Sequence, residues 1–223
     1  MTTYRKLVFR DGEIYHVFNR GIERRSMFSD RRTLGRAKQL IKFYRHKEIP
    51  MRFSKAINQP QDIREKILTK LYASERLVDI LCYCLMPNHF HFLLRQNSDK
   101  GIPIFISNFT NAYTKYLNTR QNRTGTLFEG AFKAVRIESD EQLIHVSRYI
   151  HINPVVSCVV KEEDLLTYPW SSYPEYLSLS ADNIVEKEIV LQMFSSVSRY
   201  QEFIADQIDY GKKLEEIKHL VIE

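Results

Sequence analysis

The stretch that decides how this chain folds is LCYCLMPNHFHFLLR, residues 81–95. It is apolar on both sides of Met86-Pro87-Asn88, and proline and asparagine are typical turn residues. Apolar runs of this length that are bounded by turn residues favour strands. We therefore predict a hairpin of two strands, at about residues 77–85 and 89–95.

Two histidines lie in the second of these strands, one residue apart. Because side chains alternate between the faces of a strand, His89 and His91 point to one face, whereas Phe90, Phe92 and Leu94 point to the other. The apolar side chains are explained as core. Paired imidazoles can bind zinc, manganese, iron or nickel and leave positions for water or substrate, although a histidine pair without a metal is the commoner case.

The cysteines of the first strand are a possible addition to this pair. If residues 86–88 form the turn, Cys84 faces Phe90, and both Cys82 and Cys84 lie on the core side. A shift of one residue would bring them to the histidine face instead. We expect both thiols to act as small buried hydrophobic groups. With Cys158 they make an odd number, which indicates reduced thiols.

The order of the other elements predicts the fold. They are a strand over 14–20 that Gly21 ends, a helix over about 31–46 after Asp30, an insertion over 48–76 with a helix at about 61–74, an amphipathic helix over 102–118, a strand at about 130–137, and a helix from the Ser139/Gln142 capping box to Asn153-Pro154. This order is that of an α+β, ferredoxin-like or RRM-like split βαβ fold with an antiparallel sheet. We expect helices on one face of the sheet and an open second face for a site.

We divide the chain into a main domain, residues 1–160, and a C-terminal extension, residues 161–223. The sequence YPWSSYPEYL at 168–177 predicts an irregular aromatic segment that packs against the domain. Short helices of an acidic tail are expected to follow it.

Composition indicates a globular protein. Hydrophobic residues make up 43% of the 223, with only seven glycines and seven prolines, which is enough for a packed core. No run approaches the roughly 20 apolar residues that cross a bilayer, and the first residues lack the apolar block of a signal peptide. We expect a cytoplasmic protein without a membrane partner.

Charge is distributed unevenly along the chain. Residues 1–60 hold 15 Lys and Arg against 5 Asp and Glu, whereas residues 161–223 hold 6 against 13. Lysine and arginine that neutralise phosphates supply most of the non-specific affinity for nucleic acids. The basic front of the chain slightly favours a nucleic-acid partner over an ordinary solvated surface.

The helix that begins after Ser139 carries further candidate groups. His145, Tyr149 and Asn153 recur every four residues and therefore lie along one side of it. A tyrosine and an amide one turn apart could approach a metal together. A half-buried tyrosine whose hydroxyl reaches solvent is the commoner explanation of such spacing.

Together these residues resemble a known family. PNHFH (87–91) and RYIHINPV (148–155), with YHVFNRG (15–21) before them and GTLFEGAFK (125–133) between them, are similar to motifs of the REP-associated tyrosine transposases, within the single-tyrosine HUH transposase superfamily. HUH denotes histidine, bulky hydrophobe, histidine, which HFH satisfies. The resemblance covers about residues 13–176, apart from the insertion.

The resemblance implies a metal-dependent single-strand DNA endonuclease and strand transferase that acts on hairpin or palindromic DNA. It implies that His89 and His91 hold Mg²⁺ or Mn²⁺, that Asn153 is a third ligand, and that Tyr149 forms a 5′-phosphotyrosine intermediate. A tyrosine has an ordinary pKa near 10, so its attack needs a polarised phosphate and a well-placed phenol. No small-molecule substrate is expected.

Other residues of the same types are assigned differently. We expect Tyr113 and Tyr116 to pack in the core. His145 could lie near the metal, but we expect capping or surface roles for His145 and His151. His16 matches the family pattern and is interpreted as structural. Side chains that flank the proposed site are expected to contact DNA: Arg20, Arg24, Arg25, Arg120, Arg123, Lys133 and Arg136.

Two other functions remain open, as does the oligomeric state. RNA-recognition domains with the same split βαβ fold stack bases on an open sheet face, so the chain could be a non-catalytic module that binds single-stranded nucleic acid. It could also be a domesticated repressor with a silent site. Both a monomer and a homodimer with shared sites fit the sequence.

Overall fold

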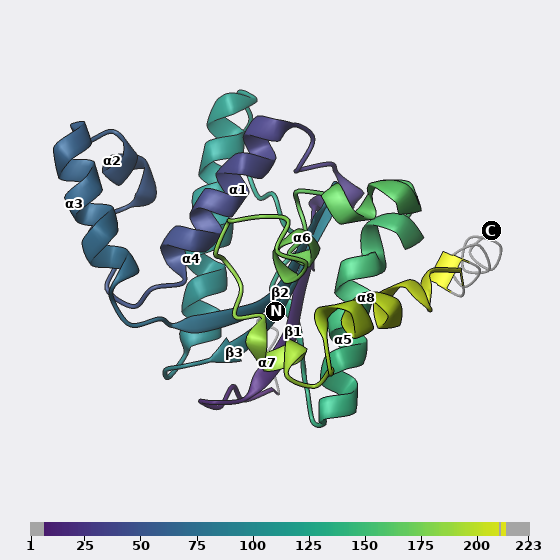
Figure 1. Cartoon of the computed structure of the whole chain (residues 1–223). Helices are drawn as coiled ribbons and strands as arrows, with labels where there is room; N and C mark the ends of the chain where they lie inside the picture. The colour runs from purple at the N-terminus through teal and green to yellow at the C-terminus, as the bar shows by residue number, and fades with distance from the viewer. Residues whose placement is uncertain (1–6, 210, 213–223) are drawn as a thin grey trace.

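The computed structural model describes residues 7–209 and 211–212, and its fold confirms the predicted α+β class (Figure 1). Four strands form one antiparallel sheet in the order β2-β3-β1-β4. The strands are β1 (Ile14–Arg20), β2 (Val78–Met86), β3 (His89–Gln96) and β4 (Lys133–Arg136). This order places β1 and β3, which carry most of the predicted motifs, side by side in the centre.

Helices connect and follow these strands in the predicted order. They are η1 (Ile22–Arg24), α1 (Arg31–Tyr44), α2 (Phe53–Ile57), α3 (Gln61–Tyr72), α4 (Gly101–Arg120), α5 (Asp140–Val156), η2 (Glu162–Thr167), α6 (Tyr173–Tyr176), α7 (Glu188–Leu191) and α8 (Val197–Ala205). The sequence pattern of the insertion predicts only the second of its two helices. Figure 1 shows α2 and α3 extending from one side of the body.

Helices α1 and α4 cover one face of the sheet, as predicted. Phe90 and Phe92 of β3 are fully buried there, with their ring centres 4.9 Å apart. Phe105 and Phe109 of α4 complete an aromatic cluster, in which the Phe92 ring lies 5.8 and 5.7 Å from theirs. Burial of such side chains is the main source of stability, so this face holds the larger core.

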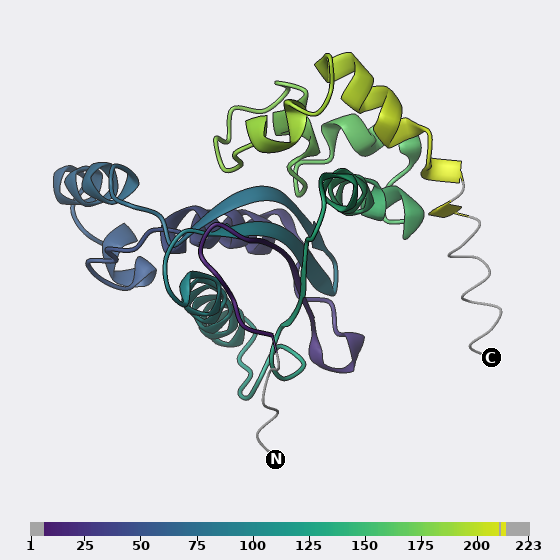
Figure 2. The same ribbon diagram turned by 90° about the horizontal axis from the view of Figure 1, so that it is seen from below.

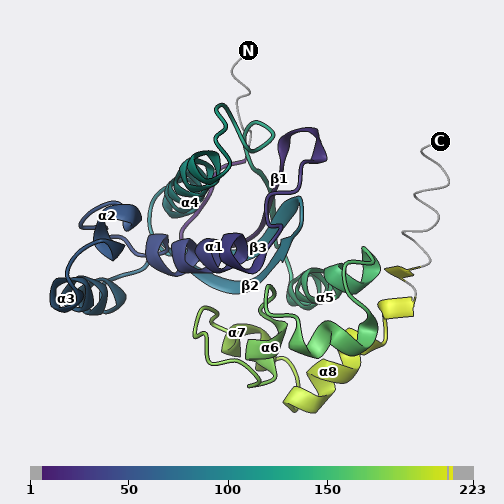
Figure 3. The ribbon, with the colours of Figure 1, turned by 90° about the horizontal axis from the view of Figure 1, so that it is seen from above.

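The second face is not open, and this part of the prediction was wrong. Figures 2 and 3 show α5 and the C-terminal helices α6 to α8 on the side of the sheet opposite α1 and α4. Their apolar side chains form a second buried cluster with Leu81, Cys82, Cys84 and Leu93 of the sheet. Among the described residues, the extension supplies eight of the 18 buried members of this cluster. A sheet face with so many apolar side chains is stable only when it is covered.

The aromatic segment 168–177 packs against the domain as predicted. It pairs with the outer edge of β2: the Leu85 N–H donates to the Trp170 carbonyl at 2.8 Å, and the Ser172 N–H donates to the Tyr83 carbonyl at 2.9 Å. The Tyr176 hydroxyl donates to the Leu81 carbonyl at 2.8 Å. These bonds satisfy backbone groups that an edge strand would otherwise expose.

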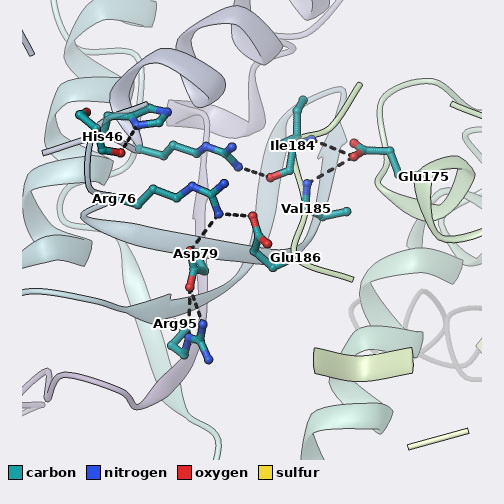
Figure 4. Close-up of polar contacts among 10 residues, drawn as sticks. His46, Arg76, Asp79, Arg95, Glu175, Ile184, Val185 and Glu186 are labelled. Atoms are coloured by element: carbon teal, nitrogen blue, oxygen red, sulfur yellow. Dashed lines mark hydrogen bonds and ion pairs between the residues drawn. The ribbon is translucent and has the colours of Figure 1, made fainter. Parts of the chain in front are cut away.

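A polar network fastens the later part of the extension to the same edge (Figure 4). Arg76 forms ion pairs with Asp79 of β2 and with Glu186 of the extension. The carboxylate of Glu175 accepts from the backbone N–H groups of residues 184 and 185 at 2.8 and 3.3 Å. The acidic tail beyond residue 212 lies outside the described residues, and the boundary at residue 160 stays a prediction.

A buried histidine joins α5 to the extension. Nδ1 of His151 lies 2.7 Å from the Tyr200 hydroxyl, and its Nε2 lies 2.7 Å from the Ser172 hydroxyl. Burial lowers the pKa of His151 to about 3. The neutral ring therefore bridges three parts of the chain, and the predicted capping or surface role was wrong for this residue.

The hairpin register differs from the predicted one by one residue. The turn contains only Pro87 and Asn88, so that Met86 pairs with His89 and Cys84 pairs with His91. Both cysteines therefore lie on the histidine face, not on the face of α1 and α4. Tertiary contacts explain the tighter turn, since the Pro87 carbonyl accepts from two N–H groups of the 21–28 loop.

Helix α5 begins as predicted and ends later. The Ser139 hydroxyl accepts from the Gln142 N–H at 3.1 Å, which caps the N-terminus. The helix continues through Pro154 to Val156, where the sequence predicted an end at Asn153. Proline removes one helical hydrogen bond, and burial of the last turn, including Val155, offsets that loss.

Candidate active site

The predicted nucleophile and the histidine pair lie together within one chain. The Tyr149 ring of α5 is 5.4 Å from the His91 ring of β3, measured between ring centres. The His89 ring is 4.9 Å from that of His91. His16 of β1 is the third imidazole, with its ring centre 6.0 Å from that of Tyr149. The sheet and one helix thus bring four chemically versatile rings to one place.

Strand geometry explains how the sheet presents these rings. Phe18 of β1 pairs with His91, and Arg20 pairs with His89. Directly paired residues of an antiparallel sheet share a face, so His16, Phe18 and Arg20 lie on the histidine face. The residues between them face the core of α1 and α4.

Tyr149 lies at the border of the second core. Its neighbour Ile150 is fully buried, whereas Tyr149 is 46% exposed. The apolar stripe of α5 therefore docks the helix on the sheet, and the tyrosine extends from the edge of that contact. A phenol that is both held in place and accessible can contact a polymer that binds to this face.

His91 is held in its neutral form. Only 5% of the residue is exposed. Burial lowers the pKa of His91 well below its ordinary value, and the nearby His89, His16 and Arg20 lower it further. A neutral imidazole keeps a lone pair on one nitrogen, which is the state that binds metals.

Each histidine of the pair has its Nδ1 atom engaged by a neighbour. The His89 Nδ1 atom lies 2.6 Å from Oδ1 of Asn88. The His91 Nδ1 atom lies 2.9 Å from Nε2 of His16. Metal-binding histidines commonly use one ring nitrogen for the metal and the other for such a hydrogen bond.

The candidate donor set consists of the two paired imidazoles, with Asn153 as the predicted third ligand. Among residues 7–209 and 211–212, no group of three or more His, Cys, Asp or Glu side chains is arranged to hold a metal ion. Asn153, the predicted third ligand, follows Tyr149 by one helical turn and is buried, and its Oδ1 accepts from the Ser157 hydroxyl at 3.4 Å. Its role as a ligand stays a prediction.

The cysteines do not extend this donor set, although they share its face. Cys84 pairs with His91 across the hairpin, but its sulfur packs on the Met86 sulfur at 3.6 Å. Burial raises the pKa of the Cys82 thiol to about 12 and raises that of Cys84 as well. Metals bind thiolates, so both thiols act as buried apolar groups, as predicted.

Of the residues predicted to contact DNA, those on strands β1 and β4 do not all lie on the same face of the sheet. Arg20 and Lys133 are exposed on the histidine face, where Lys133 pairs with Phe18. Arg136 pairs with Tyr15 and so lies on the opposite face, where it forms an ion pair with Glu13 at 2.8 Å.

The remaining predicted arginines lie in loops or at a helix end. Arg120 forms an ion pair with Asp30 at 3.1 Å. Arg123 donates to the side chain of Asn118 at 3.1 Å. Arg24 and Arg25 are exposed in the loop that follows β1.

That loop is tied to the turn of the histidine hairpin. The Gly21 N–H donates to the Asn88 carbonyl at 2.7 Å, and the Asn88 amide donates to the Arg24 carbonyl at 3.3 Å. A Cβ atom at Gly21 would lie 2.5 Å from the Arg25 carbonyl oxygen. Only glycine allows this approach, which brings the arginines of the loop to the end of β3 near His89.

His16 is the site residue that sequence reasoning assigned to the fold. The signal that could have found it is the alternation of YHVFNR, in which Tyr15 and Val17 are fully buried and His16 faces the other way. The sequence alone does not show which strand pairs with β3. The pairing of β1 with β3 is what brings His16 to His91.

Comparison with known proteins supports the predicted family and fold. Residues 49–153, which carry the histidine pair and Tyr149, match the family model described as "Transposase IS200 like". A solved REP-associated tyrosine transposase bound to a REP hairpin is similar in fold, with a TM-score of 0.54 and 16% identity over 82% of this chain and 90% of that chain. No curated protein sequence matches the chain.

Two further solved structures share less. A transposase-like protein from Deinococcus radiodurans R1 has a TM-score of 0.36 and 13% identity over 67% of this chain and 95% of that one. A tRNA(His) guanylyltransferase from Saccharomyces cerevisiae has a TM-score of 0.36 and 11% identity over 85% and 80%. Scores this low carry no inference about this chain. The match of residues 49–153 to the IS200-like transposase model and the shared fold support the resemblance seen in the motifs.

Proposed function

We propose that this chain is a transposase that cuts and rejoins single-stranded DNA at hairpin or palindromic sequences, with Tyr149 as the nucleophile. One observation carries the proposal: the Tyr149 ring lies 5.4 Å from a buried histidine that belongs to an HxH pair. A phenol beside paired imidazoles suits metal-assisted phosphoryl transfer.

The covalent step balances without an external energy source. The Tyr149 oxygen attacks the phosphorus and its proton leaves to solvent. The bond from phosphorus to the 3′ oxygen breaks, and that oxygen takes up a proton from solvent. The products are a 5′-phosphotyrosine and a free 3′-OH. Attack by another 3′-OH on the same phosphorus releases Tyr149 and rejoins the strand, so the energy of the cleaved bond is conserved in the ester.

His89 and His91 would hold the divalent ion, Mg²⁺ or Mn²⁺, with Asn153 as the third ligand. When bound, the ion supplies Lewis-acid polarisation of the scissile phosphate and neutralises charge on the departing oxygen. Buried His91 excludes water from one side of the site, because only 5% of the residue is exposed. Tyr149 is exposed and lies on the side of the site that solvent can reach.

A single copy of the chain suffices for this arrangement. Tyr149 and both histidines come from the same chain, and His151 links α5 to the extension that covers the same sheet. These contacts support a site that works within one molecule. A dimer is therefore not needed for the chemistry.

DNA would reach the site across the exposed parts of the histidine face. Arg20 and Lys133 flank His89 and Phe18 on that face and supply positive charge for phosphates. The solved relative in fold is bound to a REP hairpin, which supports a hairpin as the probe. Arg24 and Arg25 lie in the adjoining loop.

The alternative of a non-catalytic module has less support. Base stacking in RNA-recognition domains uses an open sheet face, whereas α5 and the extension cover much of this one. A repressor with a silent site differs from the enzyme only in activity. The experiment that detects a covalent adduct separates the enzyme from both alternatives.

The test uses an end-labelled single-stranded hairpin with Mn²⁺ and a denaturing gel. The wild-type chain should leave a protein-linked band, and Tyr149→Phe should abolish that band while hairpin binding changes by less than about twofold. Phenylalanine keeps the ring and its packing and removes only the attacking oxygen. An adduct that persists in Tyr149→Phe would refute the assignment.

A matched control is available in Tyr72, which is 40% exposed on α3. Tyr72→Phe should form the adduct as the wild type does, because the residue is part of the insertion and not of the histidine face. His89→Ala and His91→Ala should both lose metal-dependent cleavage. Undiminished cleavage in the presence of a chelator would count against the metal.

A further inference from the structure

We infer that Asn88 and His16 are positioning residues that fix the proton on Nδ1 of His89 and His91, so that both rings offer Nε2 to a metal. This inference rests on the proposed metal-binding role of the two histidines. It concerns residues that contact the ligands and not the metal. Three contacts carry it: two are made by the Asn88 side chain, and one joins His91 to His16.

For His89, the direction of the hydrogen bond is set by Asn88. An amide oxygen can only accept, so the His89 Nδ1 atom, 2.6 Å from Asn88 Oδ1, must carry the proton. The orientation of the amide is fixed in turn, because its nitrogen donates to the Arg24 carbonyl at 3.3 Å. A flipped amide would place its oxygen against that carbonyl oxygen. A neutral His89 with its proton on Nδ1 has its lone pair on Nε2.

For His91, the partner is a second imidazole. The two ring centres are 5.2 Å apart and the ring planes differ by 21°, while His91 Nδ1 and His16 Nε2 are 2.9 Å apart. The distance between the two ring centres exceeds the distance between the two nitrogens by about two ring radii. Both nitrogens therefore lie close to the line that joins the ring centres. The contact is an aligned N–H···N hydrogen bond between side-by-side rings.

Only one direction of that bond is compatible with a metal on His91. If His16 donated, a neutral His91 would carry its proton on Nε2 and would have no lone pair left for a metal. If His91 donates from Nδ1, its Nε2 is unprotonated and His16 accepts. Such hydrogen bonds orient a ligand ring and raise its basicity.

The location of the two partners explains why they act together. Asn88 precedes His89 in the hairpin turn, and His16 comes from β1, which pairs with β3. One partner is therefore supplied by the local sequence and the other by sheet pairing. Both strands must be in register for the two rings to present the same nitrogen.

The first test reads the proton directly. Long-range ¹H–¹⁵N NMR of protein labelled on histidine, without metal at pH 8, distinguishes a proton on Nδ1 from one on Nε2. Both His89 and His91 should carry it on Nδ1, with the signals assigned through His89→Gln and His91→Gln. A proton on Nε2 of either ring would overturn the inference for that ring.

The second test measures Mn²⁺ affinity by electron paramagnetic resonance in the absence of DNA. His16→Leu and Asn88→Ala should each weaken binding by about 10- to 100-fold, as removal of such partners commonly does. His16→Gln keeps an acceptor and should recover most of the affinity. His145→Gln is the control for loss of an imidazole on α5 and should bind Mn²⁺ as the wild type does.

The outcomes separate this inference from the function it rests on. If His89→Ala leaves Mn²⁺ affinity unchanged, the proposed metal site is wrong. If His89→Ala abolishes Mn²⁺ binding but His16→Leu does not alter it, the proposed metal site is supported and the proposed role of His16 is wrong. Dispersed NMR spectra of each variant verify that it is folded.

Discussion

The two faces of the central strands use neighbouring residues for opposite purposes. On β3, Phe90 and Phe92 are fully buried against α4, whereas His89 and His91 point to the face of Tyr149. On β1, Tyr15 and Val17 alternate with His16 and Phe18 in the same way. On these two strands, one face is buried core and the other carries the rings of the candidate site. Because successive side chains of a strand point to opposite faces, a short strand can contribute to the core on one face and to the candidate site on the other.

The second face is itself divided. Over β2 it is apolar and covered by the extension, which packs on Cys82, Cys84 and Met86. Over β1 and β4 it carries His16 and Lys133 and is more exposed. The extension therefore stabilises one half of the face and leaves the other half accessible beside Tyr149.

The largest expected effect is on the face of α1 and α4. Phe92→Ala should lower the free energy of unfolding by about 3–5 kcal/mol, because it opens a cavity among rings that are fully buried. Phe18→Ala, on the other face, should cost less, because its ring is only half-buried. Urea denaturation followed by circular dichroism measures both. Equal losses would mean that the two faces contribute equally to stability.

A smaller effect concerns the covered half of the second face and depends on pH. Burial lowers the pKa of His151 to about 3 in the folded chain, whereas an unfolded histidine titrates near 6.5. Between these values the unfolded state binds the proton and the folded state does not. Stability is therefore complete above pH 6.5 and falls by about 1.4 kcal/mol per pH unit below it for this residue.

His151→Gln should flatten that dependence, since glutamine has no proton to take up. The slope of unfolding free energy between pH 6.5 and pH 5 should decrease by about 1.4 kcal/mol per unit relative to wild type. The glutamine variant should also be less stable at pH 7.5, because one side-chain amide replaces bonds to both Tyr200 and Ser172. A wild-type slope in this variant would show that the folded chain protonates His151.

The smallest expected effect compares the two faces of β4. Lys133 lies on the histidine face and Arg136 on the other, where it pairs with Glu13. If hairpin DNA binds as proposed, Lys133→Gln should lower the slope of log affinity against log salt by about 0.7–0.9, the loss of one phosphate contact. Arg136→Gln should leave that slope unchanged. Fluorescence anisotropy from 50 to 200 mM salt gives both slopes. A lower slope for Arg136→Gln and an unchanged slope for Lys133→Gln would place the DNA on the face of Arg136 and contradict the proposal.

The sequence predicts much of this architecture because its signals are local. The hairpin, the order of the elements and the cap of α5 at Ser139 follow from short-range patterns, and the structure contains all three. Alternation alone separates His89 and His91 from the phenylalanines. The helical spacing places Tyr149 on a side of α5 from which it can approach the two histidines.

The errors arise where distant segments decide the outcome. The hairpin turn is tighter than its sequence predicts because the 21–28 loop binds the Pro87 carbonyl, and this shift moves Cys84 to the histidine face. The face expected to be open is covered because the extension returns to the edge of β2. Neither contact has a signal in the local sequence.

The order of the amino acids fixes which side chains share a face within one strand or helix, because the backbone periods are two and 3.6 residues. Contacts between distant segments place His16 against His91, bring Tyr149 beside both, and cover β2 with the extension. Those contacts join residues far apart in the chain. They form only when burial of the two cores offsets the entropy of bringing such segments together.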